Sequence, residues 1–168
     1  SNSEGVELET NQGLIKSVNC IIATNGFAKQ WIEDDIQPAR AQVIVTNEIE
    51  NLQVKGTFHY QKGYYYFRNI GNRILLGGGR NLDFKGETTE SFETTPQIQQ
   101  KLEDLMRSTI IPNQNFKIEY SWSGIMGVGD TKSPILKMLN KNTAIGVRLG
   151  GMGVALGSQV GKSLANYF

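Results

Sequence analysis

Residues 144–168, AIGVRLGGMGVALGSQVGKSLANYF, end the chain and decide the fold that we expect. The stretch begins with a short apolar strand over 144–147, passes through a glycine turn and ends in a helix. Glycines let the backbone approach a ligand closely, and the first turn of a helix offers free N–H groups and the positive end of a dipole. Gly151, Gly153 and Gly157 therefore have the local spacing of a dinucleotide-binding turn.

A complete dinucleotide-binding unit needs a further strand and an acidic residue about 20 positions after the glycines. Only 11 residues follow Gly157. We therefore expect that the turn does not begin such a unit, and that its helix faces something supplied by the rest of the protein. An enzyme that binds a nucleotide phosphate at this turn alone is disfavoured for the same reason.

Composition restricts the class of protein and its partners. The chain has 168 residues, of which 39% are hydrophobic and 20% are charged, as in an ordinary globular fold. The net charge is +1 and the basic residues are scattered, so we expect neither a nucleic acid nor a membrane partner. Since no membrane span and no N-terminal signal are visible, we expect a cytoplasmic protein. Ser1-Asn2 look like a cloning remnant on a chain cut from a longer one.

A single cysteine and a single histidine limit the side-chain chemistry. Cys20 excludes an internal disulfide and fits a reducing compartment. It lies in a run of β-branched residues, which favours a core residue over a nucleophile or a flavin attachment point. His59 alone forms neither a metal-binding cluster nor a recognisable catalytic triad, so we expect no metal site.

The N-terminal part of the sequence predicts strands followed by a short helix. Alternation and a central turn predict a β-hairpin over 6–15. The nearly continuous apolar run 18–24 has the pattern of a strand buried on both faces, and a short helix is expected over 27–33. The polar, proline-containing stretch 34–38 then marks a boundary.

The middle of the chain predicts an antiparallel meander with one helix. Thr95 as N-cap and Pro96 in the first turn predict a helix over 95–108 with one apolar face toward the sheet. Another strand is expected over 116–122 and a glycine loop over 124–134. The meander segments are 42–46, 57–61, 64–69 and 73–76, and the apolar helix residues are Ile98, Leu102, Leu105 and Met106.

Five short motifs follow one another along the chain: Ile21-Ile22-Ala23-Thr24-Asn25-Gly26; Pro38-Ala39-Arg40-Ala41-Gln42; Tyr64-Tyr65-Tyr66 followed by Ile74-Leu75-Leu76-Gly77-Gly78; Trp122-Ser123-Gly124 followed by Asp130 and Pro134; and Gly150-Gly151-Met152-Gly153-Val154. In this order they resemble the FAD-dependent amine and amino-acid oxidases of the glycine oxidase, sarcosine oxidase and D-amino-acid oxidase type, with Ala41 in place of the usual glycine. The resemblance covers only the C-terminal half of the family pattern, without the N-terminal GxGxxG unit that holds the ADP part of FAD. We therefore expect non-covalent FAD in a full-length parent protein and weak or no FAD binding by this chain.

The resemblance implies two cofactor-contacting segments. Gly150, Gly151, Met152, Gly153 and Val154 would place backbone N–H groups near the flavin, where they stabilise negative charge. The alternative is a helix packed tightly on a strand by small residues. Ala23, Thr24, Asn25 and Gly26 would form a second turn close to the cofactor, with a plain strand end as the alternative.

The resemblance also implies substrate-binding residues. Tyr64 corresponds to a tyrosine of the substrate pocket, and alternation in a strand places Tyr66 on the same side. Aromatic packing across strands is the alternative for both. Met126 stands where the amino-acid oxidases carry the arginine that binds the substrate carboxylate. Either the substrate is an amine without a carboxylate at this place, or another cation replaces the arginine.

Three arginines are candidates for that cation, and each has the alternative of an ordinary surface residue: Arg80, Arg68 and Arg148. In this family the flavin takes a hydride equivalent from the carbon of the C–N bond, and the imine then hydrolyses. No catalytic acid or base is identifiable in the sequence.

The predicted fold class is α+β, with a substrate-binding domain over 34–134 built on about five to seven antiparallel or mixed strands. Residues 1–33 and 135–168 are predicted to be two pieces of a truncated, Rossmann-like FAD-binding domain that lie side by side. Their exposed edges should favour a homodimer of the fragment. The predicted function is that of an inactive fragment of an FAD-dependent oxidoreductase, which oxidises the C–N bond of an amine or amino-acid-like substrate. The alternative is a non-catalytic small-molecule-binding or interaction domain.

Overall fold

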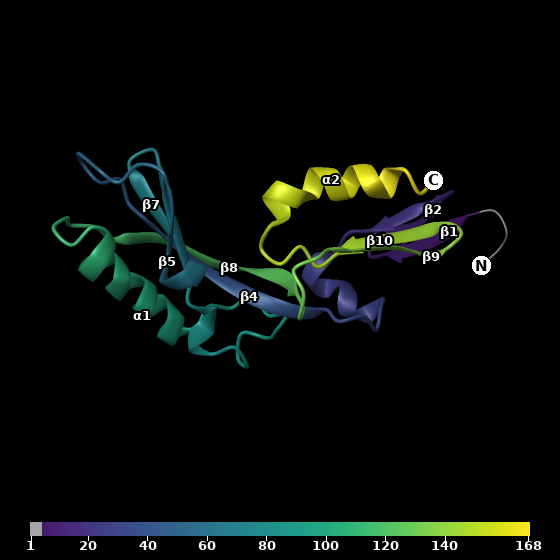
Figure 1. Cartoon of the computed structure of the whole chain (residues 1–168), viewed down its shortest axis with the longest axis horizontal. Coiled ribbons are helices and arrows are strands. Elements are labelled where there is room, and N and C mark those ends of the chain that lie inside the picture. The colour runs from purple at the N-terminus through teal and green to yellow at the C-terminus, as the bar shows by residue number, and fades with distance from the viewer. Residues whose placement is uncertain (1–4) are drawn as a thin grey trace. The chain divides into compact units, whose positions relative to one another are not determined.

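The computed structural model describes residues 5–168, which divide into two compact units (Figure 1). We call Ala39–Ile125 the central unit. The split unit consists of the residues up to Pro38 together with Met126–Phe168. The central unit begins five residues after and ends nine residues before the predicted domain 34–134, because the stretches 34–38 and 126–134 pack with the ends of the chain.

A five-stranded sheet and one helix build the central unit. Antiparallel pairing joins β5 to β6, β6 to β7 and β7 to β4, as the predicted meander requires, and β8 completes the sheet beside β4. In Figure 1 the helix α1 lies along one face of this sheet. The elements are β4 (Gln37–Thr46), β5 (Thr57–Tyr60), β6 (Tyr65–Ile70), β7 (Arg73–Gly78), β8 (Ile118–Val128) and α1 (Pro96–Leu105), with short 3-10 turns η2 (Gln61–Gly63) and η3 (Arg80–Leu82).

Helix α1 confirms the predicted start and the predicted apolar face. Thr95 is the N-cap and Pro96 opens the first turn, because a proline there loses no intrahelical hydrogen bond. Ile98, Leu102 and Leu105 are buried against the sheet, and the chain continues into a single π-type turn, η4 (Met106–Ile110). Each such side chain contributes about 1.5–3 kcal/mol on full burial. The helix is therefore held by packing on the sheet.

Two distant segments of the chain form the sheet of the split unit. Strand β3 (Cys20–Ile22) pairs in parallel with β10 (Thr143–Val147), with Thr143 opposite Cys20 and Ile145 opposite Ile22. This pairing confirms the prediction that the two ends of the chain lie side by side. The remaining elements are the hairpin β1 (Val6–Thr10) and β2 (Gly13–Ser17), the 3-10 helix η1 (Asn25–Gln30), β9 (Ile135–Asn140) antiparallel to β10, and α2 (Gly153–Ala165).

Helix α2 packs on β10 through a glycine. A Cβ atom at Gly146 would lie 2.4 Å from Cδ1 of Leu164 and 3.2 Å from Cγ1 of Val160. Only a residue without a side chain lets the helix approach the strand this closely. On the opposite side of the sheet, Ile145 and Val147 pack with Ala28, Ile32 and Ile36.

Two of the predicted elements differ from the structure at the N-terminal side. The run 18–24 was expected as a strand buried on both faces, and this is wrong: β3 spans three residues, and Val18 and Ile21 are 68% and 43% exposed. Strand β3 lies at the edge of its sheet, so within residues 5–168 no neighbouring strand covers its free side. The short helix expected over 27–33 is the 3-10 helix η1, which starts two residues earlier.

The glycine loop expected over 124–134 is also partly wrong. Strand β8 continues through Gly124 and Gly127 to Val128. A Cβ atom at Gly127 would lie 2.8 Å from Oδ1 of Asn25 and 3.1 Å from Cδ1 of Ile36. The glycine here allows close approach within a strand and does not mark a loop, and the strand β9 that follows was not predicted.

The helices of residues 5–168 include none that is both long and apolar enough to cross a membrane.

Candidate functional site

The two predicted cofactor segments follow two neighbouring parallel strands. Strand β3 ends at Ile22 and is followed by 23–26, and β10 ends at Val147 and is followed by the turn 148–152, which we call the glycine turn. Parallel neighbours end at the same edge of a sheet, where ligands of α/β folds commonly bind. The structure therefore brings these two segments together at one edge of the split unit.

A hydrogen bond joins the two segments directly. The backbone N–H of Leu149 donates to Oδ1 of Asn25 over 3.1 Å. The N–H of Gly150 donates to the carbonyl of Gly127 over 2.9 Å, and the N–H of Met152 closes the turn on the carbonyl of Leu149 over 2.8 Å. Asn25 itself has a positive φ of 45°, a conformation that asparagine adopts more readily than most residues.

The glycine turn has an unusual backbone for its sequence. Gly150 and Gly151 have φ values of 55° and 81°, which glycine adopts without strain. Arg148 has a φ of 63°, and a non-glycine residue in this region costs about 1–2 kcal/mol. The side chain of Arg148 compensates by three hydrogen bonds: from Nε to the carbonyl of Ser133 at 3.0 Å, and from Nη1 to the carbonyl and Oδ2 of Asp35 at 2.8 and 3.0 Å.

The outer side of this edge is open to a ligand. A Cβ atom at Gly150 would meet nothing within 4 Å, and one at Gly151 would meet only Sδ of Met126, at 3.3 Å. Val154 in the first turn of α2 is fully exposed, and the first N–H groups of a helix have no intrahelical acceptor. Ala23 and Thr24 are exposed, whereas Gly26 is buried in η1. The residues present therefore fit a cofactor that offers hydrogen-bond acceptors or negative charge to this edge.

Met126 lies beside the glycine turn. Its thioether is the closest side-chain group to the position that a Cβ atom of Gly151 would take. Met126, which the resemblance predicts to stand in place of a substrate-binding arginine, therefore contacts a predicted cofactor segment of the same unit. A thioether offers no charge to a carboxylate, so this place favours an apolar group.

In the central unit, Tyr64 and Arg80 meet at a third residue. The ring of Tyr64 contacts Phe84 edge-on, with ring centroids 6.3 Å apart, and the guanidinium of Arg80 lies over the same ring at 5.0 Å. Phe84 lies in the turn after η3 and is not among the residues that the sequence pattern indicates. Tyr64 lies outside β6, in a helical conformation at the end of η2, so the expected alternation with Tyr66 does not reach it.

Arg80 is a half-buried cation that forms no salt bridge among residues 5–168, although the buried carboxylate of Glu87 is near enough to act on its charge. Its Nε is buried and makes no hydrogen bond, and Nη2 has only a long contact of 3.4 Å with Oγ1 of Thr88. Burial of the guanidinium lowers the pKa of Arg80. Arg148, by contrast, is paired with Asp35, and Arg68 is exposed on β6. Of the three candidate arginines, Arg80 alone is both partly desolvated and unpaired with a carboxylate in the described chain.

Tyr66 lies on the face of the sheet opposite the buried Tyr65. It is paired across the strands with Gly77, where a Cβ atom would lie 2.5 Å from the phenol oxygen of Tyr66. The tyrosine ring thus covers the glycine. Burial raises the pKa of Tyr66, so its phenol stays neutral and can donate or accept a hydrogen bond.

In the motif Arg40-Ala41-Gln42, the two polar side chains form hydrogen bonds in the interior of the central unit. Arg40 forms a bidentate pair with Glu87, with Nε and Nη2 at 3.0 and 2.6 Å from the carboxylate oxygens, and the charge-assisted hydrogen bonds raise the pKa of Arg40. Nε2 of Gln42 donates to the same carboxylate, and Oε1 of Gln42 accepts from the N–H of Thr95 at the start of α1. Glu87 is buried and was not predicted. This cluster fixes α1 and the 83–95 loop to β4.

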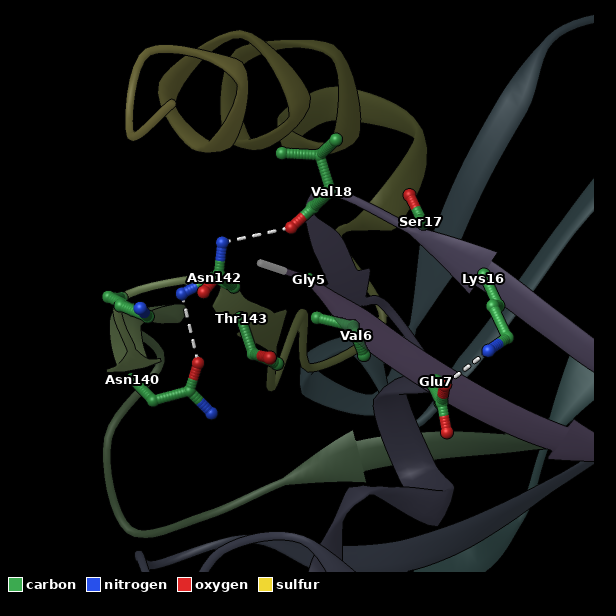
Figure 2. Close-up of a pocket in the computed structure, with 10 residues that line it drawn as sticks. Gly5, Val6, Glu7, Lys16, Ser17, Val18, Asn140, Asn142 and Thr143 are labelled. Atoms are coloured by element: carbon green, nitrogen blue, oxygen red, sulfur yellow. Dashed lines mark hydrogen bonds and ion pairs between the residues drawn. The ribbon is translucent and has the colours of Figure 1, made fainter. Parts of the chain in front are cut away.

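A separate cavity of about 910 Å³ lies in the split unit, between the β1–β2 hairpin and the turn from β9 to β10 (Figure 2). Glu7 and Lys16 pair on its wall at 2.7 Å, and Nδ2 of Asn142 donates to the carbonyl of Val18 over 2.9 Å. None of the predicted cofactor or substrate residues lines it. The cavity is therefore distinct from the candidate site.

Cys20 is a free thiol and half-buried in β3, and no group of three possible metal ligands occurs within residues 5–168.

Known proteins resemble this chain in sequence family and in fold. Residues 1–167 match the family DAO, described as FAD dependent oxidoreductase. No curated protein matches the chain. The structure is similar to L-proline dehydrogenase from P. horikoshii, at 19% identity and a TM-score of 0.75, over 98% of this chain and 46% of that one. It is also similar to glycine oxidase from Geobacillus kaustophilus, at 18% identity and a TM-score of 0.76, over 99% of this chain and 45% of that one.

A further similar structure is glycine oxidase from Bacillus cereus, at 12% identity and a TM-score of 0.75, over 99% of this chain and 47% of that one. At these identities the likeness shows the fold. The chain spans about half the length of the solved structures that it matches.

Proposed function

The chain belongs to the family of FAD dependent oxidoreductases, and from this premise we propose that it is the C-terminal part of an enzyme that oxidises the C–N bond of an amine or amino-acid-like substrate. The family uses FAD. We further propose that the split unit is part of a Rossmann-like FAD-binding domain, and that the central unit is the substrate-binding domain. The N-terminal unit that holds the ADP moiety would belong to the remainder of the parent protein.

One observation supports this proposal most strongly. The glycine turn and the 23–26 segment follow adjacent parallel strands and are joined by the hydrogen bond from Leu149 to Asn25. This joint edge presents the N-terminus of α2 and a turn with an open side, as a flavin needs for close contact with the backbone.

The proposed cofactor residues have two roles. The amides of Gly151, Gly153 and Val154 donate hydrogen bonds toward the flavin, with Gly150 and Met152 shaping the turn, and Ala23, Thr24, Asn25 and Gly26 form its second wall. Donors fixed in place before the reaction stabilise negative charge as it develops. Bound FAD supplies the redox chemistry by accepting a hydride equivalent from the substrate carbon.

For the substrate we propose Tyr64, Tyr66, Arg80 and Met126 as binding residues. A partly desolvated guanidinium without a carboxylate partner favours an anionic group on the ligand, and Arg80 has this property. Met126 favours an apolar group where amino-acid oxidases bind the carboxylate. Arg148 was a further candidate, but its pairing with Asp35 argues for a different role.

The exposed apolar residues of the split unit support a further partner surface. Leu14, Val18 and Ile21 are 55%, 68% and 43% exposed. In the parent protein the remainder of the FAD-binding domain would cover them, and in the isolated chain a second copy would do so. Analytical ultracentrifugation over a range of concentrations tests this, and a monomer at every concentration would contradict a dimer.

The proposed function is tested by the visible absorption spectrum of the full-length protein, purified without added cofactor, beside that of the 168-residue chain. We expect flavin bands in the full-length protein and none in the chain. An amine and amino-acid screen with Met126→Arg would then follow, in which the variant should gain α-amino-acid substrates. A colourless full-length protein that also fails to take up added FAD would contradict the proposal and favour a non-catalytic binding domain.

A further inference from the structure

We propose that Arg148 and Asp35 are positioning residues that hold the glycine turn in its cofactor-facing conformation without touching the cofactor themselves. The role toward the cofactor rests on the proposed function, whereas the effect on the turn does not.

The first evidence is the way in which the side chain of Arg148 is held. It is 12% exposed, and three oxygen acceptors from two segments surround it: the carbonyl of Ser133 and both the carbonyl and Oδ2 of Asp35. Guanidinium groups have a planar, fixed fork of donors, so several simultaneous hydrogen bonds fix the position of the whole side chain. Since the backbone of Arg148 has a φ of 63°, these hydrogen bonds hold a conformation that an unanchored arginine would leave.

The second evidence is that Asp35 joins three segments. Its Oδ2 accepts from Nη1 of Arg148 at 3.0 Å and from the backbone N–H of Asp130 at 2.7 Å. The loop after β8 packs against this pair so closely that a Cβ atom at Gly129 would lie 2.5 Å from Oδ2 of Asp35 and 2.8 Å from Cδ of Arg148. Hydrogen bonds from two different segments to the same carboxylate oxygen, beside a side chain that is only 12% exposed, restrict how these segments can move relative to one another. Asp35 therefore ties the start of β4, the loop after β8 and the glycine turn together.

The third line of evidence is that three consecutive residues of the glycine turn are each held by a hydrogen bond. Arg148 is fixed through its side chain, Leu149 through its N–H on Asn25, and Gly150 through its N–H on Gly127. The next amide, that of Gly151, has no backbone acceptor within residues 5–168. Three consecutive residues are thus held by hydrogen bonds, and the backbone N–H of the next residue, Gly151, makes no such bond in the described chain. A change at Asp35 would reach this donor through Arg148 and would leave the residues that face the cofactor unaltered.

The direct test is amide hydrogen exchange by NMR on the 168-residue chain, which needs no cofactor. The variants are Asp35→Asn and Arg148→Gly. Asp35→Asn removes the charge that holds Arg148, and Arg148→Gly removes the anchor while it makes the positive φ free of strain. The matched control is Asp34→Asn, because the neighbouring Asp34 pairs with Lys137 and acts on Arg148 only through its charge, with no hydrogen bond to the glycine turn among residues 5–168.

We expect the amides of Leu149 and Gly150 to exchange at least about tenfold faster in both variants, and at the wild-type rate in Asp34→Asn. The amides of α1 in the central unit serve as an internal reference for a folded protein. Unchanged exchange at Leu149 and Gly150 in either variant would overturn the proposal, as would the same acceleration in the control. Slower exchange in Arg148→Gly would also overturn it, because the backbone strain would then dominate over the anchor. If either variant fails to fold, Arg148→Lys, which keeps the charge but not the fork, gives the same comparison, and unchanged exchange there counts against the proposal.

The link to the cofactor is tested separately on the full-length protein. If the proposed function holds, Asp35→Asn weakens FAD binding by about three- to tenfold and shifts the flavin absorption maximum, whereas Asp34→Asn changes neither. A full-length protein without flavin would refute the proposed function and leave the exchange result intact. A flavoprotein with identical FAD affinity and spectrum in Asp35→Asn would refute the positioning role toward the cofactor.

Discussion

The elements of the central unit cover its apolar core, whereas the split unit leaves apolar residues of its edge strand exposed. In the central unit the largest buried side chains belong to one cluster between α1 and the sheet, and its buried charges, Arg40 and Glu87, satisfy each other. In the split unit a smaller cluster surrounds β10, while Val18 and Ile21 at the edge strand remain exposed. In the central unit, positive φ values occur mainly in turns. In the split unit, Arg148 also has a positive φ, and hydrogen bonds hold its side chain in place.

The difference indicates that the split unit, and not the central unit, needs further protein surface to cover its apolar residues. A unit with a closed core needs only its own sequence to be stable, and a unit with exposed apolar edges needs a covering. The candidate cofactor edge lies in the second kind of unit. Elements that bind ligands are commonly drawn from the less stable parts of a fold. The split unit fits this rule.

Two tryptophans allow the units to be followed one at a time. Trp31 lies in the split unit and Trp122 in the central unit, and both are about half exposed. Single-tryptophan variants, Trp31→Phe and Trp122→Phe, therefore report unfolding of one unit each by fluorescence. The predictions below are measured in these two backgrounds.

The largest effect is expected from Glu87→Ala. It leaves the guanidinium of Arg40, 5% exposed, without its carboxylate, and an uncompensated buried charge costs about 3–5 kcal/mol. Urea unfolding followed by Trp122 should show this loss. As a control, Glu103→Ala removes the carboxylate from the half-exposed pair with Arg107 and should cost about 0.2–1 kcal/mol. Equal losses in the two variants would contradict a self-contained polar core.

A smaller effect, in the other unit, is expected from Gly146→Ala. The added Cβ atom would lie 2.4 Å from Leu164 and must push α2 away from β10, which costs about 1–3 kcal/mol by overpacking. Unfolding followed by Trp31 measures the loss. Gly157→Ala is the matched control within α2, because a Cβ atom there meets nothing within 4 Å, and this variant should gain about 0.5–1 kcal/mol. A loss at Gly157 as large as that at Gly146 would contradict close packing of α2 on β10 as the reason for the glycine at 146.

The smallest effect is a pH dependence of the split unit. The hydrogen bond from Lys137 lowers the pKa of Asp34 below its ordinary value of 3.8. Since the folded pKa is depressed, the stability from this pair is present above the ordinary pKa and is lost as the pH falls through the folded value. The difference in unfolding free energy between wild type and Asp34→Asn should therefore be constant near neutral pH and shrink below about pH 4. A difference that grows on acidification would contradict the sign of the shift.

Local sequence patterns predicted those elements whose start and buried face depend only on residues within the element itself. Helix α1 has its N-cap, its proline and its apolar spacing within a dozen residues, so its start and its buried face followed from Thr95, Pro96 and Leu102. The side-by-side arrangement of the two chain ends followed only from the family resemblance, because no local pattern specifies that Cys20 lies opposite Thr143.

The failures have physical reasons in tertiary contacts. The run 18–24 is apolar, yet what covers a strand depends on its neighbours, and β3 has one neighbour within residues 5–168. Gly127 was taken for a loop residue, but the space it leaves is filled by Asn25, about a hundred positions earlier. Phe84 and Glu87 were missed for the same reason, since their partners Tyr64 and Arg40 lie on other elements. The roles of the candidate site residues stay predictions.

The parallel pairing of Cys20 with Thr143 also constrains how the protein is made. A ribosome releases Cys20 long before Thr143, so β3 must wait for its partner while the whole central unit emerges. Contacts between residues far apart in sequence also close slowly, because they require a long chain segment to be ordered first. We expect the central unit to fold as an independent nucleus, and its folding to bring the two waiting ends within reach of each other. The candidate cofactor edge then takes shape only after the central unit has folded.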